Sequence, residues 1–253
     1  MSCRGFLKVI WDLVGGRQEE GQYLAAVYFA CGYQDHQGVK GKMHIPDGFL
    51  DLKTWVGTTA VSIGALTYGV RATRERLQER EIPFMAVMAA FIFAAQMINF
   101  PIVGATSGHL IGGVLAAILL GPWTASIVMT TILVIQALLF GDGGITVLGA
   151  NVLNMALVSP FLGYYLYRWL SGRAGSGFRP GAVFVAAWIS VLGAAALMAV
   201  QLGLSGTINL TTVLSGMLFW HFFIGIGEGL ITMVVVSYLY RVRPDLFHGT
   251  TVV

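Results

Sequence analysis

The chain has 253 residues, of which 56% are hydrophobic and 11% are charged, and its mean hydropathy is +0.75. This composition excludes an ordinary soluble globular domain and predicts a polytopic membrane protein. The formal charge of +3 does not predict nucleic-acid binding, because the arginines gather in short clusters between apolar runs, as on the cytoplasmic side of a membrane protein.

Residues 1–42 are predicted to be separate from the rest of the chain. Their one apolar stretch, Tyr23 to Cys31, is too short to span a bilayer. It is also a poor signal peptide, since no basic start leads into it and Lys42 is not a small residue at a cleavage site. We therefore interpret residues 1–42 as an over-extended gene start or a removed leader, with a retained cytoplasmic or interfacial extension as the third alternative. Residues 43–253 are predicted to form one integral membrane domain.

Seven apolar segments follow, separated by breaks rich in arginine, glycine or proline. The third is short enough to be a broken or re-entrant piece, because twelve helical residues rise only about 18 Å against a hydrocarbon core of about 30 Å. We predict an all-α membrane protein, a bundle of about seven transmembrane helices at residues 54–70, 84–100, 109–120, 122–140, 146–168, 181–203 and 212–240.

The arginines predict the orientation of this bundle. Clusters within residues 71–80 and 168–179 should share one side of the membrane, which four intervening crossings allow and three do not. With seven crossings Arg241 and Arg243 fall on that side as well. The loops on the opposite side contain no lysine or arginine (101–108, 141–145 and 204–211). We predict the N-terminus outside and the C-terminus in the cytoplasm, in the cell membrane.

The dipeptide Met43-His44 predicts a transition-metal site, provided that Met43 is a free N-terminus. The α-amine, the backbone nitrogen of His44 and its imidazole would then bind one ion in fused five- and six-membered rings. One further imidazole would complete a plane of four nitrogens. Such a plane suits a d⁸ or d⁹ ion and suits magnesium or calcium badly.

His109 is the candidate for that further imidazole. It ends an uncharged, glycine-bearing stretch on the predicted outer face, at the start of a short helix. A lone histidine there would more simply bond a backbone group. Pairing with Met43-His44 on the same face favours a metal ligand, because metal sites gather ligands from separate elements. His36 and His248 lie outside the predicted spans and are expected to be solvated.

Polar side chains within the predicted spans form a second group of candidates. His221 and Glu228 are seven residues apart and share a helix face. Glu228 is the only carboxylate in a predicted span, where a lone charge costs about 3 kcal/mol, so it needs a partner. We interpret the two as a network that supports or gates the metal site, with a structural interhelical pair as the alternative. Further polar residues could shape the site or only join helices: Gln96, Asn99, Ser107, Asn151 and Asn154.

Other functional classes receive less support. The sequence has no Walker A loop and no His-Glu-x-x-His pattern. An intramembrane serine protease would need a dyad of Ser107 and His221, but the residue two before the serine is Ala105 rather than glycine. A self-sufficient metal or proton channel is the other alternative.

Several motifs stand together in this chain: Met43-His44-Ile45-Pro46-Asp47-Gly48-Phe49-Leu50, Ile98-Asn99-Phe100-Pro101, Thr106-Ser107-Gly108-His109, Gly149-Ala150-Asn151, Asn154-Met155-Ala156, and His221 with Gly225-Ile226-Gly227-Glu228. In these motifs, over about residues 43–240, the chain resembles the CbiM/NikM family, the substrate-binding S components of energy-coupling factor (ECF) transporters for cobalt and nickel. The resemblance implies that the amine of Met43, the backbone nitrogen and imidazole of His44, and the imidazole of His109 hold the metal. It also implies seven helices, with the first segment tucked into the bundle.

The resemblance further implies partners and a cargo. It implies a transmembrane coupling (T) subunit, cytoplasmic ATPase subunits and a small accessory membrane subunit, so this chain would not hydrolyse ATP itself. It favours Co²⁺ as the transported ion, consistent with cobalamin synthesis, with Ni²⁺ as the alternative, because the general order of metal affinities does not prefer cobalt. The amine and the imidazoles must be deprotonated to bind, so uptake should weaken in acid.

Overall fold

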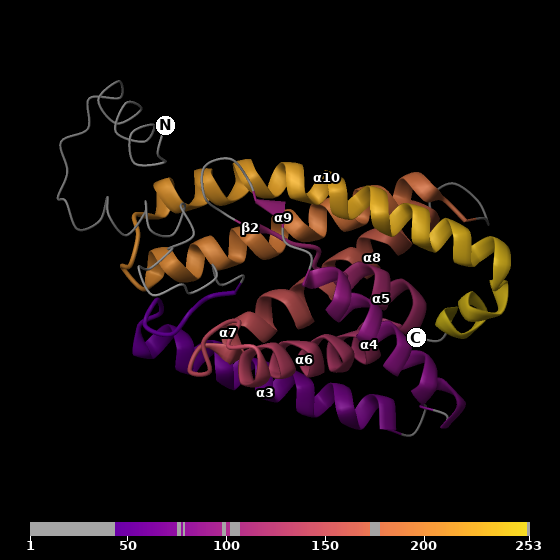
Figure 1. Ribbon diagram of the computed structural model, residues 1–253, viewed down its shortest axis with the longest axis horizontal. Helices are drawn as coiled ribbons and strands as arrows, with labels where there is room; N and C mark the ends of the chain where they lie inside the picture. Colours follow the sequence, from indigo (N-terminus) through magenta and orange to yellow (C-terminus); the bar gives the residue numbers. More distant parts are fainter. Residues whose placement is uncertain are drawn as a thin grey trace.

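The computed structural model describes residues 44–74, 77, 79–97, 100–101, 107–172 and 178–251. These residues form a helical bundle (Figure 1). Its main helices are α3 (Leu52–Arg74), α4 (Ile82–Gln96), α5 (Gly113–Leu120), α6 (Pro122–Leu139), α7 (Leu148–Asn151), α8 (Ser159–Gly172), α9 (Pro180–Leu204) and α10 (Leu210–Val242). A π-helical segment, η2 (Val152–Val158), joins α7 to α8 without a break, and two 3-10 helices, η1 (Glu79–Glu81) and η3 (Pro244–Thr251), complete the set.

Each predicted apolar segment contains a helix, with α7, η2 and α8 together forming the fifth, so the predicted all-α membrane class is confirmed. The boundaries differ by a few residues; the first helix ends at Arg74, for example, rather than at residue 70. Three helices, α6, α9 and α10, are by length and composition able to cross a membrane, and α4 is a shorter apolar helix. The count of seven crossings and the direction of the chain across the membrane stay predictions.

Local sequence signals explain where several helices begin. Pro83, Pro122 and Pro180 lie in the first turns of α4, α6 and α9, where a missing backbone N–H leaves no helical hydrogen bond unmade. Helix α10 begins after Asn209, whose side-chain oxygen accepts a hydrogen bond of 3.0 Å from the backbone N–H of Thr211.

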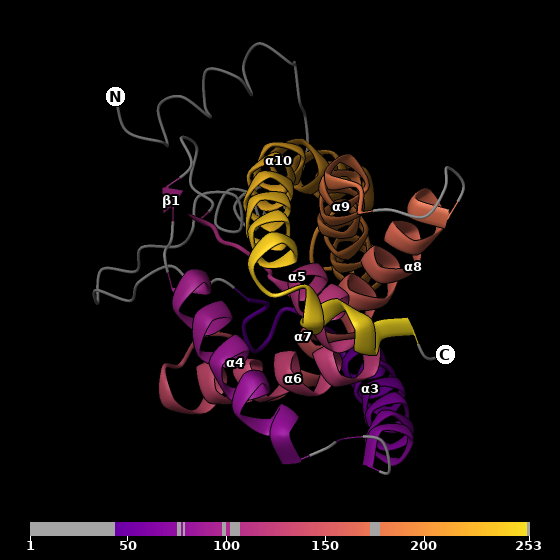
Figure 2. The same ribbon diagram turned by 90° about the vertical axis from the view of Figure 1, so that its right-hand side faces the viewer.

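Small residues let the helices pack closely. A Cβ atom on Gly149 of α7 would lie 2.5 Å from the Cα atom of Thr59 in α3, and one on Gly225 of α10 would lie 2.6 Å from the Trp188 ring of α9. Such contacts hold membrane helices together, because lipid is as apolar as the side chains and gives no hydrophobic drive between helices. Figures 1 and 2 show α9 and α10 side by side, α3, α4 and α6 on the opposite side, and α5 between the two groups.

Helix α5 differs most from its prediction. The sequence predicted one helical segment over residues 109–120, but the helix covers only Gly113–Leu120, nearly all of it buried. Gly112, just before the first residue of α5, has φ of 76°, a left-handed conformation that keeps the helix from extending back toward His109. Before it, β1 (Phe100–Pro101) and β2 (Ser107–Gly108) form a short antiparallel pair that was not predicted. Eight residues rise about 12 Å, so α5 alone cannot cross the hydrocarbon.

Candidate metal-binding site

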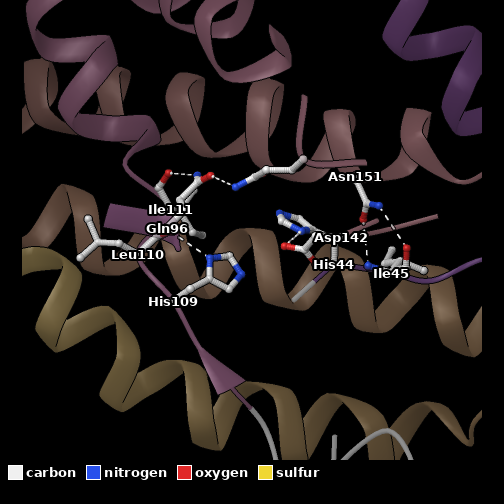
Figure 3. Close-up of polar contacts among 9 residues, drawn as sticks. His44, Ile45, Gln96, His109, Leu110, Ile111, Asp142 and Asn151 are labelled. Atoms are coloured by element: carbon white, nitrogen blue, oxygen red, sulfur yellow. Dashed lines mark hydrogen bonds and ion pairs between the residues drawn. The ribbon is translucent and has the colours of Figure 1, made fainter. Parts of the chain in front are cut away.

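The segment that begins with His44 is fixed to the bundle by its backbone. The N–H of Ile45 donates to Oδ1 of Asn151 over 3.1 Å, and Nδ2 of Asn151 donates back to the Ile45 carbonyl over 3.2 Å. The N–H of Gly144 donates to the same carbonyl over 2.9 Å. Asn151 therefore binds both polar backbone groups of the residue next to His44 (Figure 3).

Asp47 fixes the same segment to the loop between α6 and α7. Its carboxylate accepts hydrogen bonds from the N–H of Thr146, 2.9 Å, and from the hydroxyl of Thr146, 2.6 Å. Ile45 and Leu50 are buried in a small hydrophobic core with Val147 and Leu202. Further along, hydrogen bonds from Thr54 and Ser205 lower the pKa of Asp51, which stays charged at the start of α3. These contacts hold residues 44–51 in one place.

His44 is a buried ring without a hydrogen bond in the described part of the chain. The residue is 5% exposed, and neither Nδ1 nor Nε2 has a hydrogen-bond partner there. Oδ2 of Asp142 lies 3.3 Å from Nδ1, within ion-pair distance but without the geometry of a hydrogen bond. A buried polar group left in this way costs about 1–3 kcal/mol. A ligand that binds these nitrogens would recover that cost.

His109 faces His44 from a different segment. The ring centroids are 5.3 Å apart and the planes are inclined by 43°. Nδ1 of His109 lies 3.0 Å from the Leu110 carbonyl, so we assign the proton to Nδ1 and the lone pair to Nε2. A metal ion about 2 Å from an imidazole nitrogen lies about 3 Å from the ring centroid, so two rings on one ion are at most about 6 Å apart. The observed spacing fits two ligands of one ion.

Three helices hold the backbone that follows His109. Nε2 of Gln96 in α4 donates to the Ile111 carbonyl over 2.7 Å, and Nε2 of Gln136 in α6 donates to the Gln96 side chain over 2.8 Å. Both carboxylate oxygens of Glu228 in α10 accept backbone hydrogen bonds of 2.8 Å, from Ile111 and Gly112. The start of α5 is thus the partner that the buried Glu228 requires, and the partial positive charge of a helix N-terminus suits the carboxylate.

His221 and Glu228, which share a face of α10, have different partners. Nδ1 of His221 lies 2.8 Å from the Met217 carbonyl, one turn earlier in α10, whereas both Glu228 oxygens are occupied at α5. The predicted partner of Glu228 is thus the start of α5, and the proposed role of this helix face in supporting or gating the metal site stays a prediction.

The remaining predicted residues fall into two groups. Asn154 forms a reciprocal pair with Gln201 of α9, with distances of 3.0 and 2.8 Å. Met43 and Asn99 lie outside the described residues, and for Ser107 the structure describes only the backbone, in β2. Their predicted roles are therefore not tested.

Two residues at the site were not predicted, Asp142 and Gln136. A signal for Asp142 was present, because it is an acidic residue between glycines in a loop that contains no lysine or arginine. Gln136 gave no signal, since one amide in an apolar helix is common. Among the described residues, no three side chains of His, Cys, Asp or Glu form a group able to hold a metal ion. Two imidazoles alone do not complete the site, which leaves room for main-chain and amine nitrogens.

Two facing imidazoles inside a helical bundle are donors that suit a transition metal. The family model for the cobalt uptake substrate-specific transmembrane region, CbiM, matches residues 44–246. A crystal structure of a truncated transition metal transporter superposes with a TM-score of 0.73 at 37% identity, covering 79% of this chain and 99% of that one.

Relatives include transporters named for either metal. A protein of Archaeoglobus fulgidus that bears the name of a fused nickel transport protein, NikMN, is 44% identical over 206 residues, which is 81% of this chain and 68% of that protein. The cobalt transport protein CbiM of Kyrpidia tusciae is 34% identical over 216 residues, 81% and 85% of the two chains. The chain belongs to the CbiM/NikM family of substrate-specific components for cobalt and nickel transport, which confirms the resemblance found in the sequence.

Proposed function

We propose that this chain is the metal-capturing S component of an ATP-driven ECF transporter that imports Co²⁺, with Ni²⁺ as the alternative cargo. The observation that supports this most directly is the pair of imidazoles from separate segments, with centroids 5.3 Å apart and with both His44 nitrogens lacking a hydrogen bond in the described part of the chain. Nitrogen donors suit both ions and suit magnesium and calcium badly.

The proposed ligands are the amine of Met43, the backbone nitrogen and imidazole of His44, and the imidazole of His109. This set requires that the working chain begin at Met43, because a peptide bond to Lys42 would remove the amine. The family match that begins at residue 44 supports this start. Burial of Ile45 and the hydrogen bonds of Asn151 would hold the chelating end at the site whether or not an ion is present.

The proposed cycle begins with capture of the ion from outside the cell membrane. The ion would leave inward after the S component changes orientation or opens. A T subunit, ATPase subunits and a small accessory membrane subunit would supply the drive. We prefer cobalt because the matching family model is named for cobalt uptake. Nickel is the alternative, because relatives are named for nickel transport and nitrogen donors suit both ions.

Metal analysis of purified His109→Ala protein tests the site. We expect wild-type protein to retain about one ion per chain and the variant to lose it, with His248→Ala, in η3, as the matched control. Mass analysis of the same sample should show a chain that begins at Met43. Stoichiometric metal on His109→Ala, or on protein that still contains Lys42, would contradict the proposed ligands.

Reconstitution separates the transporter from the other classes. We expect Co²⁺ uptake into proteoliposomes to require the T subunit, the ATPase subunits and ATP, and to stop in His109→Ala. Uptake by this chain alone would indicate a channel. Peptide cleavage that is lost in Ser107→Ala and kept in His109→Ala would indicate a protease.

A further inference from the structure

Asp142 is an acidic residue at the candidate site that the proposed set of ligands leaves without a role. It lies in the loop between α6 and α7, and its Oδ2 atom is 3.3 Å from Nδ1 of His44. The two side chains are 10% and 1% exposed. The carboxylate thus faces the His44 imidazole, whose ring centroid lies 5.3 Å from that of His109 (Figure 3).

The backbone around Asp142 is built to keep it there. Its N–H donates to the Gln136 carbonyl at the end of α6 over 3.0 Å. Gly141 and Gly143 on either side have φ of 64° and 93°, so the turn has a conformation that other residues rarely adopt. A Cβ atom on Gly143 would lie 3.0 Å from Cβ of His44. The loop therefore lies directly against the His44 side chain.

Asp142 faces the nitrogen that chelation would use. An ion bound to both the backbone nitrogen and Nδ1 of His44 would close a six-membered chelate ring. Nε2 is too far from the backbone nitrogen to take the place of Nδ1. Donor atoms about 2 Å from one ion are about 3–4 Å apart. A carboxylate oxygen 3.3 Å from Nδ1 therefore lies next to the place where the ion would bind.

The positive charge of a bound divalent ion gives a physical reason for a carboxylate at this place. The amine and the imidazoles are neutral when they bind, and the backbone nitrogen of His44 would contribute one negative charge by losing its proton. A divalent ion would therefore leave one positive charge uncompensated at a site where the His44 and Asp142 side chains are almost fully buried. An isolated buried charge is strongly unfavourable unless an opposite charge is near. Among the proposed ligands there is no carboxylate to supply it.

We propose that Asp142 is a positioning and charge-balancing residue of the metal site. In the empty protein it holds Nδ1 of His44 toward the site, and in the loaded protein its carboxylate stands beside the ion without being one of the nitrogen ligands. This inference rests on the proposed function, and it concerns a residue outside the four-nitrogen set.

Titration calorimetry with Co²⁺ and with Ni²⁺ on the membrane-extracted protein tests this role. Asp142→Asn keeps the shape and removes the charge, and we expect the affinity to fall about 10- to 100-fold, the usual effect of losing a residue that supports a metal ligand. Asp142→Glu restores the charge and should recover most of the affinity. Asp245→Asn removes an exposed carboxylate far along the chain and should leave the affinity unchanged.

The absorption spectrum of bound Co²⁺ at saturation separates a neighbour from a ligand. We expect the band positions of Asp142→Asn to equal those of wild type, because the nitrogen set is intact. Affinity of Asp142→Asn within about twofold of wild type, a shifted spectrum, or a folded Glu variant as weak as Asn would each overturn the proposal. If the Asn variant does not fold, the Glu variant decides: near-wild-type affinity supports the role, and a tenfold loss overturns it.

His109→Ala, measured in the same series, keeps the two proposals apart. Wild-type metal binding in His109→Ala would contradict the proposed function itself. Loss of metal in His109→Ala together with full affinity in Asp142→Asn would leave the proposed function standing and would remove only the role of Asp142.

Discussion

Gly143 shows how closely the loop after α6 approaches the candidate site. Its φ of 93° favours glycine, and an added Cβ atom would lie 3.0 Å from Cβ of His44 and 3.3 Å from Nδ2 of Asn151. Gly141 has φ of 64°, but an added Cβ atom there would meet no atom within 4 Å. The two glycines therefore share the backbone requirement and differ in their contact with the site.

This difference allows a matched test at the level of one residue. Alanine at either position should destabilise the protein by about 1–2 kcal/mol, because a left-handed conformation is unfavourable for it. Only Gly143→Ala should also push His44 away from His109, and we expect a loss of metal affinity of tenfold or more. Thermal unfolding and calorimetry measure the two effects, and equal affinity in both variants would contradict the close approach.

The sequence predicted the two histidines of the site but not all of their neighbours. His44 and His109 were identifiable because each stands in an unusual stretch on the predicted outer face. The partner of Glu228 was not, since its hydrogen bonds go to Ile111 and Gly112, more than a hundred residues away in the chain. The spacing of residues along a sequence shows which side chains share a face of one helix. It does not show which residues of another helix pack against that face.

The π-helical segment η2 separates two asparagines that the sequence placed on one face. Asn151 stands at its start and binds Ile45, whereas Asn154 lies within it and binds Gln201 of α9. A π-helical turn contains more residues than an α-helical turn, so residues three apart are rotated farther from each other. The widened turn thus directs one amide toward the site and the other toward the helix packing.

The two asparagines give a matched pair at the level of this element, because both are 4% exposed and both make two hydrogen bonds. Asn151→Ala and Asn154→Ala should each lower the free energy of unfolding by about 1–3 kcal/mol, since each leaves buried groups unpaired. We expect only Asn151→Ala to weaken metal binding. Calorimetry on both variants checks this, and a larger loss in Asn154→Ala would mean that the amides do not have separate roles.

Hydropathy was sufficient to predict where the helices are, because each contains a long apolar run. It could not predict the break before α5 or the π-helical segment. The first depends on a left-handed glycine and on hydrogen bonds from α4 and α10, and the second on packing against α3 and α9. Hydropathy reflects the free energy of transferring side chains into lipid, and it contains no information on contacts between helices.

The whole molecule has two different ends. Figure 1 shows the end of α3, the end of α8, the start of α9 and the end of α10 at one end of the bundle. The positions of the arginines predicted that these helix ends lie on one side of the membrane, because Arg71 and Arg74 lie in the last turn of α3 and Arg241 in the last turn of α10. The opposite end contains the loops from α6 to α7 and from α9 to α10, which lack lysine and arginine. By the charge rule that opposite end should face outward.

Cysteine labelling in intact cells tests this orientation. Leu204, 74% exposed at the end of α9, and Asp245, whose side chain is 61% exposed, lie at opposite ends of α10. With Cys3 and Cys31 replaced by serine, an impermeant maleimide should label Leu204→Cys in intact cells and Asp245→Cys only after permeabilisation. The reverse pattern would place the C-terminus outside.

The two imidazoles are anchored to different parts of the bundle. His44 is fixed through Asn151 and the loop after α6, whereas His109 is fixed through Gln96 and Glu228, on α4 and α10. A rigid movement of α10 relative to α7 would pull directly on the backbone two and three residues after His109 and leave His44 in place. A displacement of one or two ångströms would then take the rings beyond the reach of a common ion, and the cargo would be set free with no helix unfolded.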